Sequence, residues 1–119
     1  MIKKRQLGKT NLLVSEISLG GFQLGEKTII NNNSNTSFGG MNEENSIKLI
    51  QKAVELGINT FDTADVYALG NSEHRLGIAL KDVRNKVNIF TKAGNIISNP
   101  ARNDISYHHL MAAIDRSLD

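Results

Sequence analysis

The amino-acid sequence predicts an α/β fold in which parallel strands alternate with helices. Short apolar runs typical of strands alternate along the chain with longer segments whose apolar residues recur at helical spacing. Glycines and helix-capping residues mark most boundaries between these segments. The resulting order is one hairpin followed by three strand–helix pairs, which favours parallel strands joined by right-handed crossovers.

The first part of the chain predicts a hairpin, a strand and a long connection. Residues 2–14 carry short apolar patches around a turn-like cluster at residues 8–11, which indicates a β-hairpin. A strand at residues 17–19 ends at two glycines. The connection over residues 22–40 centres on residues 31–37, with the sequence NNNSNTS. Because such side chains hydrogen-bond locally and bury little surface, we expect residues 31–37 to be a flexible loop.

The rest of the chain predicts helices and strands in strict alternation. In order, they are a helix, a strand, a helix, a strand and a helix, at residues 42–56, 58–62, 72–80, 87–91 and 106–118. Asn42 and Ser72 are placed to cap the first two helices, and Gly57 is the expected stop of the first. The last helix begins near Ser106 and has an apolar residue at every fourth position, and residues 95–104 before it are expected to be a loop.

Composition excludes several classes of function. The chain has 119 residues, 39% of them hydrophobic, which is enough for the core of one domain. Fourteen Lys and Arg residues against 12 Asp and Glu residues leave a net charge of +2, too weak and scattered for nucleic-acid binding. No segment approaches the roughly 18 apolar residues of a membrane span. Without cysteine there is no disulfide, zinc–thiolate site or thiol nucleophile. We expect a soluble, cytoplasmic chain without a metal site.

Chemistry is expected at the carboxyl ends of the strands, where parallel α/β sheets bind ligands. The residues that follow the three predicted strands are Gly20, Gly21 and Phe22, then Asp62 and Tyr67, then Lys92. Each has an ordinary explanation taken singly: a tight turn, a capping carboxylate, a half-buried ring and a surface cation. Together, a phenol, an ammonium group and a carboxylate at one edge indicate a general acid.

The physical reason lies in the chemistry of phenols. A phenol has an ordinary pKa of about 10 and donates its proton poorly at neutral pH. A nearby ammonium group stabilises the phenolate, and a carboxylate beside the ammonium keeps it charged and oriented. Tyr67, assisted by Lys92 and Asp62, would thus protonate the oxygen of a carbonyl group.

At this point the sequence resembles the aldo-keto reductase family. The run GINTFDTADVY at residues 57–67 matches the best-known signature of the family, including the five-residue step from Asp62 to Tyr67. Further similarities follow in the order of the family, with RQLGKT at residues 5–10, GNSE at residues 70–73, IFTKAG at residues 89–94 and DRSL at residues 115–118.

The resemblance implies a (β/α)8 TIM barrel whose bottom is closed by the hairpin, and reduction of a small carbonyl compound, or oxidation of the alcohol, with NADP(H) or alternatively NAD(H). It implies that Tyr67 is the proton donor, that Lys92 promotes the proton transfer, and that Asp62 pairs with Lys92. By the same resemblance the cofactor would contact Gly20, Gly21, Phe22 and Asp62.

The length departs from the family pattern. Such a barrel needs about 250 residues, and 119 residues supply the hairpin and three strand–helix units. We expect residues 1–119 to be a truncated N-terminal part of a reductase domain, inactive alone and prone to self-association through open sheet edges. The catalytic histidine of the family would follow a fourth strand. His74, His108 and His109 do not match it and are interpreted as solvated helix residues.

A second class of function remains open beside the enzyme. The family that the sequence resembles also includes the potassium-channel beta subunits, which serve as partners of other proteins. The alternative is therefore a non-catalytic binding or regulatory module, or the remnant of a gene.

Overall fold

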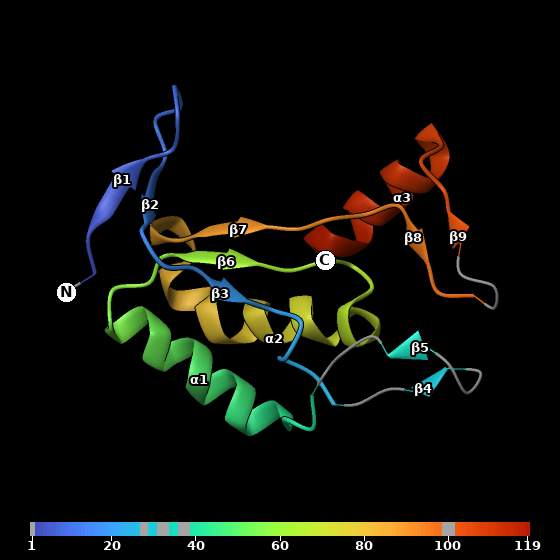
Figure 1. Cartoon of the computed structure of the whole chain (residues 1–119), viewed down its shortest axis with the longest axis horizontal. Helices are drawn as coiled ribbons and strands as arrows, with labels where there is room; N and C mark the ends of the chain where they lie inside the picture. Colours follow the sequence, from blue (N-terminus) through green and yellow to red (C-terminus); the bar gives the residue numbers. More distant parts are fainter. Residues whose placement is uncertain (1, 27–28, 31–33, 36–38, 99–101) are drawn as a thin grey trace.

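A computed structural model describes residues 2–26, 29–30, 34–35, 39–98 and 102–119 (Figure 1). Its strands are β1 (Lys4–Gln6), β2 (Leu13–Ser15), β3 (Leu19–Gly20), β4 (Ile29–Ile30), β5 (Ser34–Asn35), β6 (Thr60–Asp62), β7 (Asn88–Phe90), β8 (Asn95–Ile96) and β9 (Arg102–Asn103). Its helices are α1 (Glu43–Glu55), α2 (Asn71–Leu80) and α3 (Tyr107–Leu118), with 3₁₀ turns at Tyr67–Gly70 and Lys81–Lys86.

Three parallel strands form the central sheet, in the order β3–β6–β7. Gly20 of β3 lies opposite Asp62 of β6, and Asp62 lies opposite Phe90 of β7. The three strands therefore finish at one edge, and this confirms the α/β fold with parallel strands. Figure 1 shows the strands side by side, with α1 and α2 below them and the β1–β2 hairpin near the ends where they begin.

Asparagine side chains attach the hairpin to the starting ends of the strands. Asn59, just before β6, accepts a hydrogen bond from the Ser15 N–H (2.7 Å) and donates one to the Leu13 carbonyl (2.9 Å). Asn88 of β7 donates a second hydrogen bond to the same carbonyl (3.1 Å). The hairpin thus occupies the end of the sheet opposite to the predicted site.

The core lies between the sheet and the two neighbouring helices α1 and α2. Its buried residues are Leu24, Ile50, Ala53, Phe61, Leu76, Ala79, Leu80 and Val87. Phe61 comes from the middle strand and Ile50 from α1, and both are fully buried. Burial of each such side chain contributes roughly 1.5–3 kcal/mol to stability.

In the part of the chain that the structure describes, no helix has the length and apolar character needed to cross a membrane.

The predicted boundaries of α1 are confirmed, whereas the predicted cap of α2 is wrong. Asn42 accepts a hydrogen bond from the Asn45 N–H (2.9 Å), and Gly57 follows the helix with a φ of +96°. α2 begins at Asn71 after Gly70 and has no side-chain cap. Ser72 lies inside its first turn. Its hydroxyl donates a hydrogen bond to the Gly21 carbonyl after β3 instead of capping the helix.

Two short antiparallel pairs occupy segments predicted as loops. β4 pairs with β5, so Ser34 and Asn35 of the asparagine-rich segment belong to a strand, while residues 31–33 and 36–37 lie outside the described residues. β8 pairs with β9 within residues 95–104. Each of these strands has only two residues, too short for a periodic pattern to reveal it.

α3 begins as predicted but is weakly buried. The Ser106 hydroxyl accepts a hydrogen bond from the His109 N–H (3.3 Å). Ala113 is the buried residue of the helix, whereas Ile114 and Leu118 are exposed. His74 and His108 are exposed as expected. The expectation for His109 is wrong, because its Nε2 atom is buried and has no hydrogen-bond partner among the described residues.

Candidate active site

The strand ends bring the three predicted catalytic side chains together. The Lys92 ammonium, just beyond β7, donates to Asp62 Oδ1 (2.6 Å) and to the Thr63 carbonyl (2.6 Å). It also lies 5.4 Å from the centre of the Tyr67 ring. The carboxylate, the ammonium and the phenol are therefore neighbours at the carboxyl edge of the sheet. The side chains of Lys92 and Asp62 are about half exposed to solvent.

Phe22 also contacts the tyrosine. The rings of Phe22 and Tyr67 meet edge to face, with 4.9 Å between their centres. Such a pair contributes about 0.5–1.5 kcal/mol beyond the burial of its surface. Tyr67 opens a 3₁₀ turn in which Ala68 and Leu69 have φ angles of +49° and +58°. The ring thus packs against Phe22, and its main chain belongs to a turn with two left-handed residues.

The two glycines after β3 have different surroundings. A Cβ atom at Gly21 would lie 2.6 Å from Ser72 Oγ and 2.9 Å from both the Asp62 carbonyl oxygen and Thr63 Oγ1. Among the described residues, a Cβ at Gly20 would meet only Gln23 Oε1, at 3.9 Å. Gly21 is therefore required by close packing. Gly20 leaves its main chain open to an approaching ligand.

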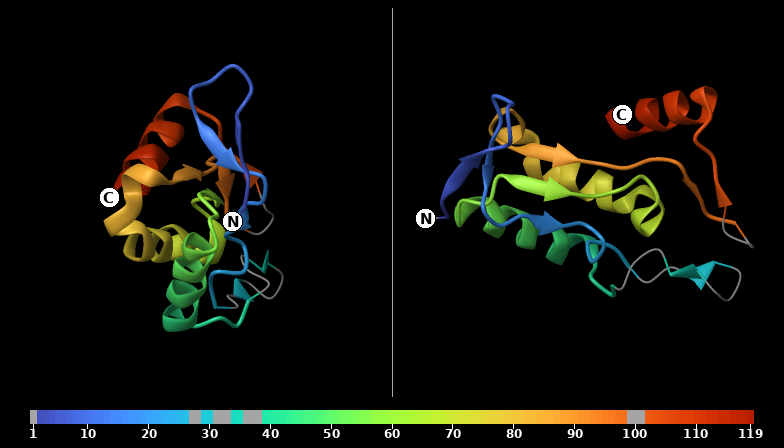
Figure 2. Two further views of the ribbon diagram at one scale, coloured as in Figure 1. Left: turned by 90° about the vertical axis from the view of Figure 1, so that its left-hand side faces the viewer. Right: turned by 45° about the horizontal axis from the view of Figure 1, so that its top comes forward.

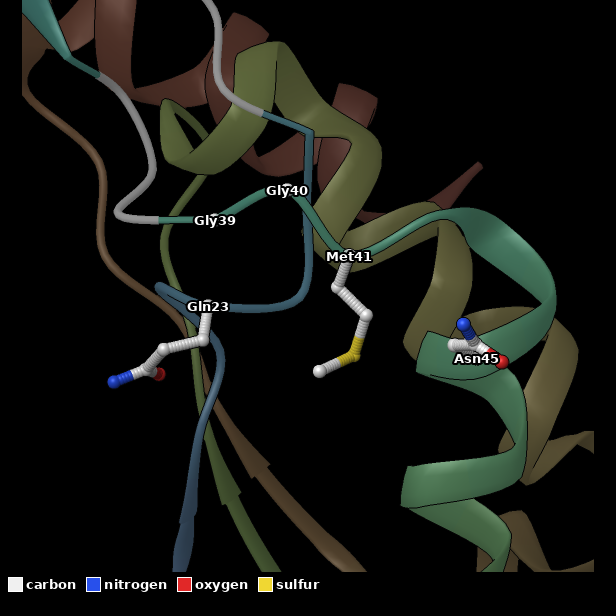
Figure 3. A pocket seen from close by; sticks show the side chains of 5 residues that line it. All are labelled: Gln23, Gly39, Gly40, Met41 and Asn45. Atoms are coloured by element: carbon white, nitrogen blue, oxygen red, sulfur yellow. The ribbon is translucent and has the colours of Figure 1, made fainter.

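A hollow of about 670 Å³ opens on the loop between β3 and α1. The described residues that line it are Gln23, Gly39, Gly40, Met41 and Asn45. Figure 3 shows Gln23 and Met41 on neighbouring segments of this loop. Because Gln23 also lies near Gly20, the hollow adjoins the end of β3.

Asp65 and Glu73 lie behind the site and were not predicted as site residues. Burial raises the pKa of the Asp65 carboxyl, and the charge of Glu73 raises it further, against smaller opposing effects of a hydrogen bond from the Val66 main chain and of the charges of Arg116 and His109. Asp65 Oδ1 is buried without a hydrogen-bond partner among the described residues. In the same part of the chain, no three carboxylate, histidine or cysteine side chains gather to hold a metal ion. Asp65 lies in the run at residues 57–67 and Glu73 in the run at residues 70–73, but the spacing of the two residues alone gives no sign of their contacts.

Parallel strand–helix units with a polar cluster at their carboxyl edge are typical of α/β-barrel enzymes. A model of the Aldo/keto reductase family matches residues 16–119. The chain belongs to this family of oxidoreductases.

Individual relatives agree with this assignment. Aldo-keto reductase dtxS3 of Metarhizium robertsii is 36% identical over 113 residues, covering 89% of this chain and 29% of that protein. The uncharacterized oxidoreductase YqkF of Bacillus subtilis is 34% identical over 94 residues, covering 79% of this chain and 26% of that protein. The holo form of aldo-keto reductase AKR11C1 from Bacillus halodurans matches with a TM-score of 0.79 and 33% identity, over 99% of this chain and 36% of that structure. The chain thus spans less than a third of these curated relatives and has the fold of part of a (β/α)8 barrel.

Proposed function

We propose that this chain supplies the proton-donating part of a carbonyl reductase site that uses a nicotinamide cofactor. Tyr67 is the proton donor, Lys92 promotes the transfer, and Asp62 holds Lys92. The observation that carries the proposal is the position of the Lys92 ammonium, 2.6 Å from Asp62 Oδ1 and 5.4 Å from the centre of the Tyr67 ring. The substrate class is a small carbonyl compound, or the corresponding alcohol in the reverse direction.

The residues support a defined proton path. Reduction places negative charge on the carbonyl oxygen, and the half-buried Tyr67 at the carboxyl edge of the sheet supplies the proton for that oxygen. The phenolate that remains is stabilised by the Lys92 ammonium. Asp62 compensates the ammonium charge, and the tyrosine recovers its proton from solvent at this half-exposed edge after each turnover. Phe22 keeps the ring of Tyr67 in place during this cycle.

The edge also suits a nicotinamide cofactor, which we take to be NADP(H), with NAD(H) as the alternative. When bound, the cofactor supplies the hydride that reduces the carbonyl carbon. Gly20 offers open main chain, Phe22 an apolar ring, and half-exposed Asp62 a carboxylate for a hydroxyl group. Gly21 lies in the same strand end and keeps it packed against α2.

The test uses a completed barrel, in which residues 1–119 are joined to the part of the Bacillus halodurans reductase that this chain does not cover. Tyr67→Phe removes the proton but keeps the ring, so kcat for benzaldehyde with NADPH should fall by about 10²–10⁴-fold. The dissociation constant for NADPH should stay near that of the completed barrel without the substitution. Consumption of NADPH measures the first quantity, and quenching of its fluorescence measures the second.

Tyr107→Phe is the matched control, because Tyr107 is 73% exposed on α3 and should leave kcat unchanged. Equal activity of Tyr67→Phe and Tyr107→Phe would reject Tyr67 as the donor. A completed barrel that binds NADPH but reduces no aldehyde or ketone would favour the non-catalytic binding module. The 119-residue chain alone is expected to show no turnover.

A further inference from the structure

Lys92 lies beyond the part of its strand that the sheet holds. β7 ends at Phe90, whose carbonyl accepts a hydrogen bond from the Thr63 N–H (2.7 Å). The Lys92 side chain is 47% exposed, so packing alone does not fix its direction. Its main-chain carbonyl accepts one hydrogen bond, from the Asp65 N–H (3.0 Å). A contact at Thr91, between these two carbonyls, would therefore further restrain the main chain that carries Lys92.

Glu73 provides a contact at that point. It lies in the first turn of α2, half-buried, and its Oε1 accepts a hydrogen bond from the Thr91 hydroxyl (2.5 Å). A hydrogen bond to an ionised carboxylate is roughly twice as strong as a neutral one. The charge of Glu73 also raises the pKa of the Asp65 carboxyl, whose N–H supports the Lys92 carbonyl.

The residue before Glu73 makes equivalent contacts with the other two strand ends. The Ser72 hydroxyl donates to the Gly21 carbonyl after β3 (2.8 Å) and lies 2.9 Å from Thr63 Oγ1 after β6. Two successive residues of α2 thus connect the ends of all three strands in the sheet. Figure 2 shows the start of α2 at the end of the sheet where the strands finish.

We propose that Glu73 is a positioning residue, which holds Thr91 so that the Lys92 ammonium stays directed at Asp62 and Tyr67. This inference rests on the proposed function, since it assigns Glu73 a role through Lys92. The competing explanation is that Glu73 only stabilises α2, because a carboxylate in the first turn interacts favourably with the helix dipole.

The experiment measures the completed barrel with benzaldehyde and NADPH. Glu73→Ala and Thr91→Val should each lower kcat by about 10-fold, the order expected for the loss of one charge-assisted hydrogen bond, while KM stays near its original value. The double variant should lose no more than either single variant, because both remove the same contact. Thr91→Ser keeps the hydroxyl and should restore kcat.

Glu43→Ala is the matched control, because Glu43 is an exposed carboxylate in the first turn of α1. It removes the same helix-end charge without touching a strand end. An equal loss of kcat in Glu43→Ala and Glu73→Ala would overturn the proposal in favour of helix stability.

Amide hydrogen exchange separates this proposal from the proposed function. In Thr91→Val the Asp65 amide, bonded to the Lys92 carbonyl, should exchange faster, while the Thr63 amide, bonded within the sheet, should not. If Tyr67→Phe is silent but the Asp65 amide responds, the proposed function fails and the positioning of Lys92 stands. Unchanged kcat together with unchanged exchange at Asp65 would overturn the proposal itself.

Discussion

We expect the Lys92–Asp62 pair to contribute more to the proposed chemistry than to stability. Both side chains are about half exposed, and pairs of this kind contribute only about 0–1 kcal/mol to folding. The same ammonium is the charge that faces the Tyr67 ring. Lys92→Met is therefore expected to remove the cation from the proposed proton donor, Tyr67, at little cost to the fold.

In the completed barrel, Lys92→Met should lower kcat by at least about 10²-fold and change the unfolding free energy by less than about 1 kcal/mol. Lys48→Met is the control, because Lys48 forms an exposed ion pair with Glu44 on α1, away from the strand ends. Steady-state kinetics and urea denaturation measure the two effects. A large stability loss with normal turnover in Lys92→Met would show that the pair is structural.

Asp65 is a carboxyl group whose surroundings oppose its charge. Burial, and then the charge of Glu73, raise its pKa above the ordinary 3.8. The folded state therefore holds the proton more tightly than the unfolded state. Stability consequently falls as the pH rises from 3.8 through the raised pKa, and it stays reduced at higher pH.

Asp65→Asn should for this reason be more stable than the unchanged completed barrel at neutral pH, with an advantage that shrinks below pH 3.8. Asp104→Asn should behave oppositely. Hydrogen bonds from Ser106 lower the pKa of Asp104, so its charge stabilises the fold at neutral pH and this contribution disappears in acid. Denaturation curves from below pH 3.8 to neutral pH check both signs. A gain in stability at neutral pH in both variants would contradict the explanation.

At the scale of elements, the 3₁₀ turn after Tyr67 stores backbone strain. Ala68 and Leu69 both adopt left-handed φ angles, which cost roughly 1–2 kcal/mol for a residue with a Cβ atom. The turn nevertheless buries Ala68 and directs the chain from β6 into α2. The strain is therefore a local cost of placing Tyr67 beside Lys92.

Asn tolerates the left-handed region better than Leu, so Leu69→Asn should recover roughly 1 kcal/mol relative to a matched site. Leu56→Asn is that site, since Leu56 is 55% exposed against 50% for Leu69 but has an ordinary φ of −77°. Urea denaturation of both variants gives the comparison. Equal losses of stability would mean that the turn carries no strain.

Local signals in the sequence predict elements well, and contacts between distant segments poorly. Asn42 and Gly57 act on their own helix, so their roles are visible in the sequence. Asp62, Tyr67 and Lys92 could be placed together because parallel strands finish at one edge. The role of Ser72 could not be predicted, since its partner Gly21 is 51 residues away and a serine at that position also suits a helix cap.

At the scale of the whole molecule, the described chain is open. Its radius of gyration is 15.0 Å, where a compact domain of this length has about 13.5 Å. β3 and β7 are the outer strands of the sheet. α3 also presents an exposed apolar stripe, formed by Tyr107, Met111, Ile114 and Leu118. Unpaired strand edges and apolar stripes are both surfaces that associate.

The isolated 119-residue chain should therefore self-associate in a concentration-dependent way. Sedimentation should show species larger than 13.1 kDa, and lysines in place of Ile114 and Leu118 should reduce them. A monomer at all concentrations, with a sharp thermal transition, would contradict this prediction.

The glycine at position 21 also limits how this part of the barrel can evolve. Serine at 72 and threonine at 63 could shrink to make room for a side chain, and such compensating pairs are the usual escape from a packing constraint. Here one of the obstructing atoms is the main-chain oxygen of Asp62, at 2.9 Å. Every amino acid at position 62 would carry that oxygen, so no second substitution restores the space. A lineage that loses this glycine has to shift the end of a strand, and the carboxylate that holds Lys92 shifts with it.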